Sequence, residues 1–214
     1  MCDDDGLFGV REVVIVEAVR LPVGRGHREK GYYRDVHPST LMATTYRALF
    51  ERSGVDPNEV GDVIGGGVEH MGHNSFADGF EVMKEHGFAF SEGLNERFNL
   101  VPQGISAEMI ADRWEIPRSE LDEIGVRSHQ LAARATAEGR FEREIVPFAV
   151  NGDTYATDQG IRPDTSIEAL AKLKPASKED GKITAGNSSQ VSDGAAAVLL
   201  MSAEKANELG VAAR

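Results

Sequence analysis

At 214 residues, the chain is long enough for one large domain or two small ones. Its formal net charge of −12 opposes binding to nucleic acid, whose phosphates are also negative. No run approaches the roughly 18 apolar residues of a membrane span, and the single cysteine excludes a disulfide within the chain and is typical of a reducing cytoplasm.

The N-terminal part of the chain has the pattern strand, helix, strand. Val13–Val19 is a β-branched run of strand length, which predicts a strand buried on both faces. His37-Pro38 opens a predicted helix, because proline suits the first turn, and Ser53-Gly54 ends it. A second strand is predicted over Val60–Ile64. This order indicates a right-handed βαβ unit with a parallel sheet, and therefore an α/β fold.

The rest of the chain is mainly helical in its pattern until a final strand. A helix is predicted over 106–114, and another begins near Pro117 with Ser119 as its N-cap. A short helix over 167–173, a buried strand over 195–201 and a closing helix over 202–209 follow. The inward face of the helix after Pro117 is predicted to carry Leu121, Ile124, Ser128, Leu131 and Ala135.

Four segments, in order along nearly the whole chain, carry a resemblance to a known family: Ile15–Gly24, Gly67–Met71, Glu138–Phe148 and Ile183–Val198. Together they resemble the N-terminal half of the thiolases, the acyl-CoA acyltransferases that make or break carbon–carbon bonds. The resemblance implies an α/β, thiolase-like N-terminal domain with βαβ layers, an incomplete parallel-rich sheet and an inserted, mainly helical loop domain.

The same resemblance implies how the chain is divided. The thiolase-like core is expected to comprise residues 1–73 and 183–214, and the inserted loop domain residues 74–182. The C-terminal thiolase domain, with its glycine-histidine-proline motif and second cysteine, is expected to be absent from this sequence.

The chain departs from the family where the nucleophilic cysteine is expected. In thiolases several dozen residues, including that cysteine, separate the second strand from the segment that resembles Gly67–Met71. Here Asp62–Gly66 runs directly into that segment, which indicates an internal deletion. Cys2 lies in an acidic N-terminal stretch, without the helix N-terminus or histidine that activates a thiol. No catalytic residue is therefore predicted.

Two residues are predicted by resemblance to contact coenzyme A (CoA), which with acyl-CoA is the expected substrate; no covalently bound cofactor is expected. Arg162 matches the family's arginine beside the nucleotide phosphates, and Ser189 matches its serine beside the pantetheine arm. Guanidinium groups pair well with phosphate, and hydroxyls with amides. The family position that often carries an adenine-facing serine is Ala169 here. The alternatives are a surface ion pair for Arg162 and a turn for Ser189.

No metal site is predicted. His70, His73 and His86 are close in the sequence but have no cysteine or third ligand at a spacing typical of zinc sites.

The family resemblance thus implies an acetyl-CoA acyltransferase lineage. The missing cysteine predicts that the chain is inactive, whether it is a natural fragment or a deletion product. The alternative is a non-catalytic CoA-binding or assembly subunit that pairs with another thiolase-like chain; the family's habit of pairing also makes a homodimer an expectation. An unrelated α/β binding protein is disfavoured by the four segments. A sheet that has lost central strands predicts a marginally stable protein that self-associates.

Overall fold

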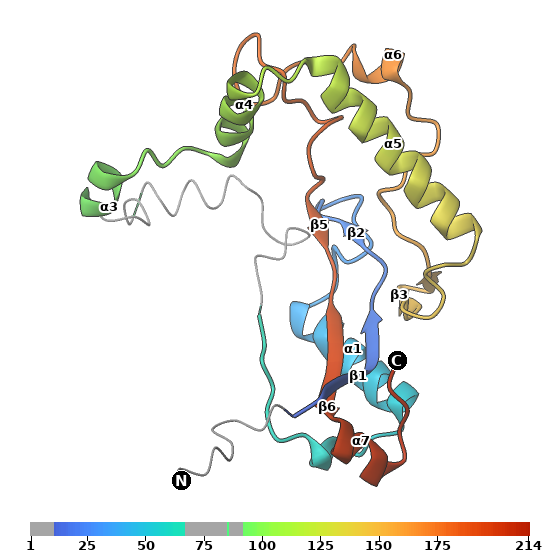
Figure 1. The fold of residues 1–214 in the computed structure, drawn as a ribbon. Coiled ribbons are helices and arrows are strands. Elements are labelled where there is room, and N and C mark those ends of the chain that lie inside the picture. The colour runs from blue at the N-terminus through green and yellow to red at the C-terminus, as the bar shows by residue number, and fades with distance from the viewer. Residues whose placement is uncertain (1–10, 67–84, 86–91) are drawn as a thin grey trace.

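The computed structural model describes residues 11–66, 85 and 92–214. Helices and strands are both present, as the α/β prediction requires, and Figure 1 shows their arrangement. In chain order they are β1 (Val13–Arg20), β2 (Gly24–Arg25), α1 (Pro38–Ser53), the 3-10 turn η1 (Pro57–Glu59), α3 (Glu92–Arg97), α4 (Gln103–Arg113), α5 (Arg118–Ala137), β3 (Phe148–Val150), β4 (Asp153–Tyr155), α6 (Ile167–Leu170), β5 (Ser192–Asp193), β6 (Ala196–Ser202) and α7 (Ala203–Leu209).

The main sheet of the described residues is the antiparallel pair of β1 and β6. Ile15 lies opposite Leu200 and Val19 opposite Ala197, and the register shifts at a bulge between Ile15 and Glu17. A bulge of this kind inserts one extra residue into one strand. It changes which residues face inward, so that Val16 and Val19 both pack into the core.

The prediction of a strand over Val60–Ile64 is wrong. Residues 60–66 form neither helix nor strand, and the side chains of Val63 and Ile64 are 64% and 95% exposed. Gly61 interrupts the run and three glycines follow it in the sequence, which weakens any extended pairing. Without this strand there is no βαβ crossover in the described residues. The strand pairs there are antiparallel, contrary to the expected parallel-rich sheet.

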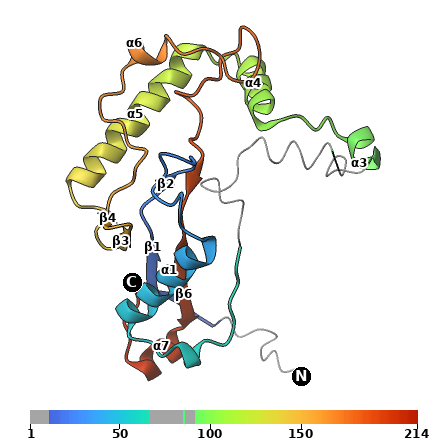
Figure 2. The same ribbon diagram turned by 180° about the vertical axis from the view of Figure 1, so that it is seen from behind.

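Helix α1 covers one face of the β1–β6 pair, as Figures 1 and 2 show from opposite sides. It begins as predicted: the His37 side chain accepts from the backbone N–H of Ser39, and Pro38 occupies the first turn. It ends at Gly54, which takes the left-handed conformation with φ 69°. The core between helix and sheet consists of Val16, Val19, Leu49, Val55, Ala197 and Leu199.

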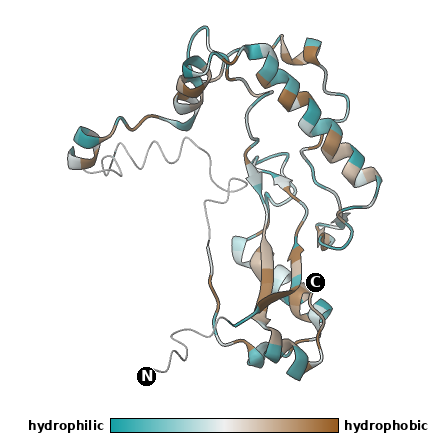
Figure 3. Cartoon of the chain, in the orientation of Figure 1, coloured by the Kyte–Doolittle hydropathy of each residue, from teal (hydrophilic) through white to brown (hydrophobic). Residues whose placement is uncertain are grey.

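The opposite face of the β1–β6 pair, here called the outer face, is not covered by described residues. It consists of Val13, Ile15, Val198 and Leu200, and three of these side chains are more than half exposed: Val13 64%, Val198 54% and Leu200 57%. Figure 3 shows both strands coloured as hydrophobic over much of their length. The prediction that Val13–Val19 is buried on both faces is therefore wrong for this structure.

Helices α4, α5 and α6 gather at the end of the molecule away from α1 and α7 (Figures 1 and 2). Helix α5 begins at Arg118 with Pro117 as its N-cap, so the predicted cap Ser119 lies inside the helix instead. The Arg118 guanidinium fixes this start, since it donates to Asp122 at 2.8 Å and to the carbonyl of Leu170 at 2.7 Å.

The predicted inward face of α5 is also partly wrong. Ile124, Ser128 and Leu131 are exposed, whereas Asp122 is buried and Gly125 and His129 are half-buried. Asp122 turns inward because its carboxylate accepts hydrogen bonds from Arg118 and from the side-chain amide of Asn187.

Candidate functional site

The segment that carries Arg162 is anchored to the loop after β1 by two neighbouring side chains. The Asp158 carboxylate accepts two hydrogen bonds from the Arg20 guanidinium, at 2.7 and 3.1 Å, and one from the backbone N–H of Val23 at 2.7 Å. The Gln159 side-chain oxygen accepts from the backbone N–H groups of Arg25 and Tyr32. These bonds fix where the chain enters residues 160–165, here called the Arg162 turn, in which the Arg162 carbonyl accepts from the N–H of Thr165.

Arg20 is the central cation of this anchor. Its guanidinium also donates to Glu144 at 2.7 Å and lies over the Phe141 ring. Burial opposes the charge on Arg20, but its hydrogen bonds to Asp158 and Glu144 outweigh that effect, and its pKa is raised above the ordinary value. Arg20 is therefore a fixed positive charge that holds the anchor together.

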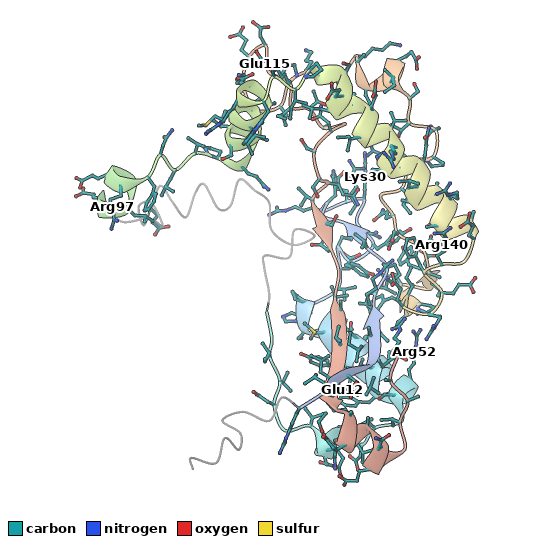
Figure 4. All side chains as sticks on the ribbon, in the orientation of Figure 1. Glu12, Lys30, Arg52, Arg97, Glu115 and Arg140 are labelled. Atoms are coloured by element: carbon teal, nitrogen blue, oxygen red, sulfur yellow. The ribbon has the colours of Figure 1, made fainter. Side chains whose placement is uncertain are left out.

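A second attachment joins the same region to α1. The Arg52 guanidinium, labelled in Figure 4, donates to the backbone carbonyls of Arg143 and Ile145 at 2.8 and 2.9 Å. Arg140, also labelled, lies just beyond the C-terminal end of α5. The end of α5 is thus connected to the sheet and its helix through the residues around Glu144.

Arg162 itself lies on the surface beside α5. Its backbone N–H donates to Nδ1 of His129 at 3.2 Å. Among the residues that the structure describes, its guanidinium has no hydrogen-bond or ion-pair partner. The alternative of a surface ion pair is therefore not realised within the described part of the chain. An unpaired guanidinium is suited to an anionic ligand such as a phosphate.

The segment Ile183–Val198, here called the signature segment, is held by side-chain hydrogen bonds at its start. The Asn187 oxygen accepts from the backbone N–H of Thr184 at 2.8 Å, and its amide nitrogen donates to Asp122 and to the carbonyl of Lys182. Asn187 thus stabilises the backbone turn that begins at Thr184. The bond to Asp122 also ties the signature segment to α5.

A buried carboxylate supports the same turn from α4. Glu108 is 1% exposed and accepts from the backbone N–H groups of Lys182 and Ile183, at 2.9 and 2.8 Å. Its charge is satisfied by these donors and by Lys178 at 3.9 Å. Glu108 therefore serves to hold the chain rather than to react.

Helix α5 and the signature segment approach each other closely at two glycines. A Cβ atom on Gly125 would lie 2.4 Å from the backbone oxygen of Gly186, and one on Gly186 would lie 2.6 Å from the Leu170 side chain. A side chain at Gly125 would push α5 and the signature segment apart, and a side chain at Gly186 would clash with Leu170 of α6. The absence of a Cβ therefore sets the distance between α5 and the signature segment.

A groove lies between α5, the Arg162 turn and the signature segment, with a volume of about 530 Å³. We call it the α5 groove. The structure brings both predicted residues, Arg162 and Ser189, to its walls, and both are exposed. The Ser189 hydroxyl donates to the carbonyl of Gln190 at 3.3 Å. The polar residues of the groove are Ser128, His129, Asp158, Arg162, Asn187, Ser188, Ser189 and Gln190.

His129 also lines this groove, although it is not among the residues predicted from the sequence. No local pattern marks it, because its bond to Arg162 joins residues 33 positions apart. Ala169 lies in α6 and is not among the residues of the α5 groove. The remaining candidates, Cys2, His70, His73 and His86, lie outside the described residues. Within the described part of the chain, no helix is long and apolar enough to cross a membrane.

Comparisons with known proteins give a consistent result. Residues 63–204 match the family model described as "Thiolase, N-terminal domain". The chain is 35% identical to a 3-ketoacyl-CoA thiolase of Marinobacter nauticus, over 94% of this chain and 66% of the relative. It is 33% identical to a peroxisomal 3-ketoacyl-CoA thiolase of Arabidopsis thaliana, over 94% of this chain and 57% of the relative. The chain thus spans about two thirds or less of the length of these relatives.

Solved structures agree with this assignment of the fold. An acetyl-CoA acetyltransferase from Syntrophomonas wolfei superposes with a TM-score of 0.75 at 27% identity, covering 95% of this chain and 67% of that one. The corresponding enzyme from Bacillus anthracis gives a TM-score of 0.73 at 26% identity, covering 95% and 68%.

The alignment with the Marinobacter relative also bears on the expected deletion. It runs over 268 positions, although this chain has 214 residues and only 94% of them take part. The relative therefore has many positions within the aligned region that have no counterpart in this chain.

Proposed function

The chain belongs to the thiolase family, and from this premise we propose that it binds CoA or acyl-CoA in the α5 groove without carrying out acyl transfer by itself. By lineage the ligand is the acyl-CoA of an acetyl-CoA acyltransferase. The proposal assigns the nucleotide phosphates of CoA to Arg162 and the pantetheine arm to Ser189.

The observation that carries the proposal is the unpaired guanidinium of Arg162 at the α5 groove. A guanidinium matches phosphate oxygens in geometry as well as in charge. The chain as a whole carries a net charge of −12, which repels an anionic ligand. A cation without a protein partner among the described residues is therefore the group best suited to overcome that repulsion locally.

The second half of the proposal rests on what acyl transfer requires. The reaction needs a thiolate nucleophile, a proton-transfer group and donors for the developing oxyanions. Cys2 is the one cysteine of the sequence, and three aspartates follow it. Negative neighbours disfavour a thiolate, and no cysteine is present at the α5 groove. The chain is therefore expected to hold the substrate without reacting with it.

Isothermal titration with CoA tests the binding. Arg162→Ala is expected to weaken CoA affinity by about tenfold or more, because a charge-assisted hydrogen bond contributes roughly 1.5–3 kcal/mol. Arg47→Ala is the matched control: Arg47 is an exposed arginine of α1, outside the α5 groove. Equal affinities for the two variants, or no heat with the unmodified chain, would refute the proposal.

Thiolysis of acetoacetyl-CoA tests the lack of activity. The chain alone is expected to show no turnover above buffer, and Cys2→Ser is expected to change nothing. An intact thiolase serves as the positive control. Turnover by the unmodified chain that disappears in Cys2→Ser would show that Cys2 is a nucleophile after all.

The alternative function is an assembly subunit that pairs with a second copy or with another thiolase-like chain. The outer face favours it, since contiguous exposed apolar side chains are typical of interaction surfaces. Co-expression with a thiolase-like chain that has the catalytic cysteines tests this function. Failure of the two chains to co-purify would count against it.

A further inference from the structure

A direct hydrogen bond between His129 and Arg162 links α5 to the Arg162 turn. The backbone N–H of Arg162 donates to Nδ1 of His129 at 3.2 Å, and the half-buried His129 also lines the α5 groove. Because Nδ1 accepts a hydrogen bond, the neutral ring carries its proton on Nε2. The imidazole therefore acts toward Arg162 as an acceptor.

The residues on either side of Arg162 show why this bond affects the direction of the Arg162 side chain. Gln159 is the last anchored residue before it, with its N–H donating to the carbonyl of Val23 at 2.9 Å. Gly160 then follows, whose backbone is conformationally permissive. Pro163 comes next and restricts Arg162 to extended backbone angles. The bond to His129 thus fixes the N–H of Arg162, while the Arg162 carbonyl accepts from the backbone N–H of Thr165 at 3.2 Å.

From this geometry we infer that His129 is a positioning residue for the phosphate contact of Arg162. By holding the Arg162 N–H, it sets the direction in which the guanidinium leaves the backbone and keeps it at the groove. This inference rests on the proposed CoA binding. It assigns His129 an effect on affinity through Arg162, and no contact of its own with the ligand.

A double-mutant cycle, measured by titration with CoA, tests the inference. His129→Leu removes the acceptor and is expected to weaken CoA binding about three- to tenfold, the range of one neutral hydrogen bond. His129→Asn retains an acceptor oxygen near the position of Nδ1 and is expected to restore most of the affinity. Gln130→Leu, at the exposed neighbouring position on α5, is the matched control and is expected to bind like the unmodified chain.

The cycle with Arg162→Ala separates positioning from other roles. In the Arg162→Ala background, His129→Leu is expected to have no further effect, since the group that His129 orients is gone. An equal loss in both backgrounds would overturn the inference, because His129 would then act independently of Arg162. Unchanged affinity of His129→Leu, with Arg162→Ala still weak, would overturn it as well while leaving the proposed function intact.

Absence of CoA heat with the unmodified chain would overturn both proposals together. Circular dichroism and melting of each variant verify that it is folded. If His129→Leu does not fold, His129→Ala takes its place in the cycle, with the same expected outcomes.

Discussion

Single buried polar groups hold the loop after β1 in place. Tyr33 is fully buried, and its hydroxyl donates to the carbonyl of Pro22 at 2.5 Å. Its ring packs edge-on against Phe148, at 5.3 Å between centroids, in a core that also contains Leu21 and Leu41. The same loop supplies Val23, whose N–H contacts Asp158. Tyr33 thus holds Pro22, the residue next to the Val23 that contacts Asp158.

Burial raises the pKa of Tyr33, and the nearby charge of Asp158 adds to the increase. A raised folded-state pKa stabilises the fold below the unfolded pKa, near 10, and this contribution is lost as pH rises through the folded pKa. Denaturant unfolding is therefore expected to show falling stability above about pH 10. Tyr33→Phe is expected to lower stability by about 1–2 kcal/mol at neutral pH and to reduce the alkaline slope. An unchanged slope in Tyr33→Phe would contradict the assignment.

At the scale of the elements, α5 and the signature segment lie so close together that the contact leaves no room for a side chain at Gly125. Gly125 lies in the middle of α5, where glycine normally weakens a helix, yet the backbone oxygen of Gly186 occupies the space of a Cβ. Asp122, one turn earlier, connects the same two segments through Asn187. Close backbone approach and one buried hydrogen bond together determine the width of the α5 groove.

Gly125→Ala is expected to destabilise the chain by about 1–2 kcal/mol. The clash with the backbone, typically about 1–3 kcal/mol, exceeds the gain of up to about 1 kcal/mol in helix propensity. Urea unfolding measures the difference. Gly93→Ala, in α3 with open space around the Cβ position, is the matched control and is expected to leave stability unchanged or slightly higher. A stabilised Gly125→Ala would show that the two segments separate freely.

At the scale of the molecule, the dominant feature is the outer face, which no described residue covers. A two-stranded sheet with a helix on one face leaves its other face exposed. Here that face is apolar and comprises Val13, Ile15, Val198 and Leu200. Exposed β-rich apolar surface promotes association between chains. The structure thus gives a specific surface to the sequence-based expectation of self-association.

Replacing both Val198 and Leu200 by threonine is expected to shift the chain toward monomer, because threonine keeps the strand preference while reducing apolar area. Light scattering over a concentration series measures this. Leu199→Thr is the neighbouring control: Leu199 points into the core, so its change is expected to lower stability by about 2–4 kcal/mol. Equal association by the double variant and the unmodified chain would rule out the outer face as the contact.

Structural features that depend on residues close together in the sequence can be predicted from it, whereas features that depend on distant residues cannot. Helix α1 was predicted with its ends, because His37, Pro38 and Gly54 act within one turn of the helix. Val60–Ile64 has the composition of a strand, but a strand needs a partner, and composition does not supply one. The division at residues 73/74 and 182/183 stays a prediction.

The same distinction explains which residues of the candidate site could be predicted from the sequence. Arg162 and Ser189 were found by resemblance, and no spacing rule joins them. His129 was missed because its role depends on a hydrogen bond to a backbone group far along the chain. The orientation of α5 was mistaken because Asp122, a charged residue, is buried by partners that the helical pattern does not reveal.

Apart from Val23 and Phe141, the residues that line the α5 groove come from three stretches that are far apart in the sequence, 121–132, 158–162 and 185–190. A ligand bound in the groove contacts all three stretches at once. None of them can therefore unfold without releasing the ligand. By thermodynamic linkage, occupancy at a hundredfold excess over the dissociation constant adds about 2.7 kcal/mol against unfolding. Proteases should then cut the 158–165 stretch more slowly, which gives a readout that requires no turnover.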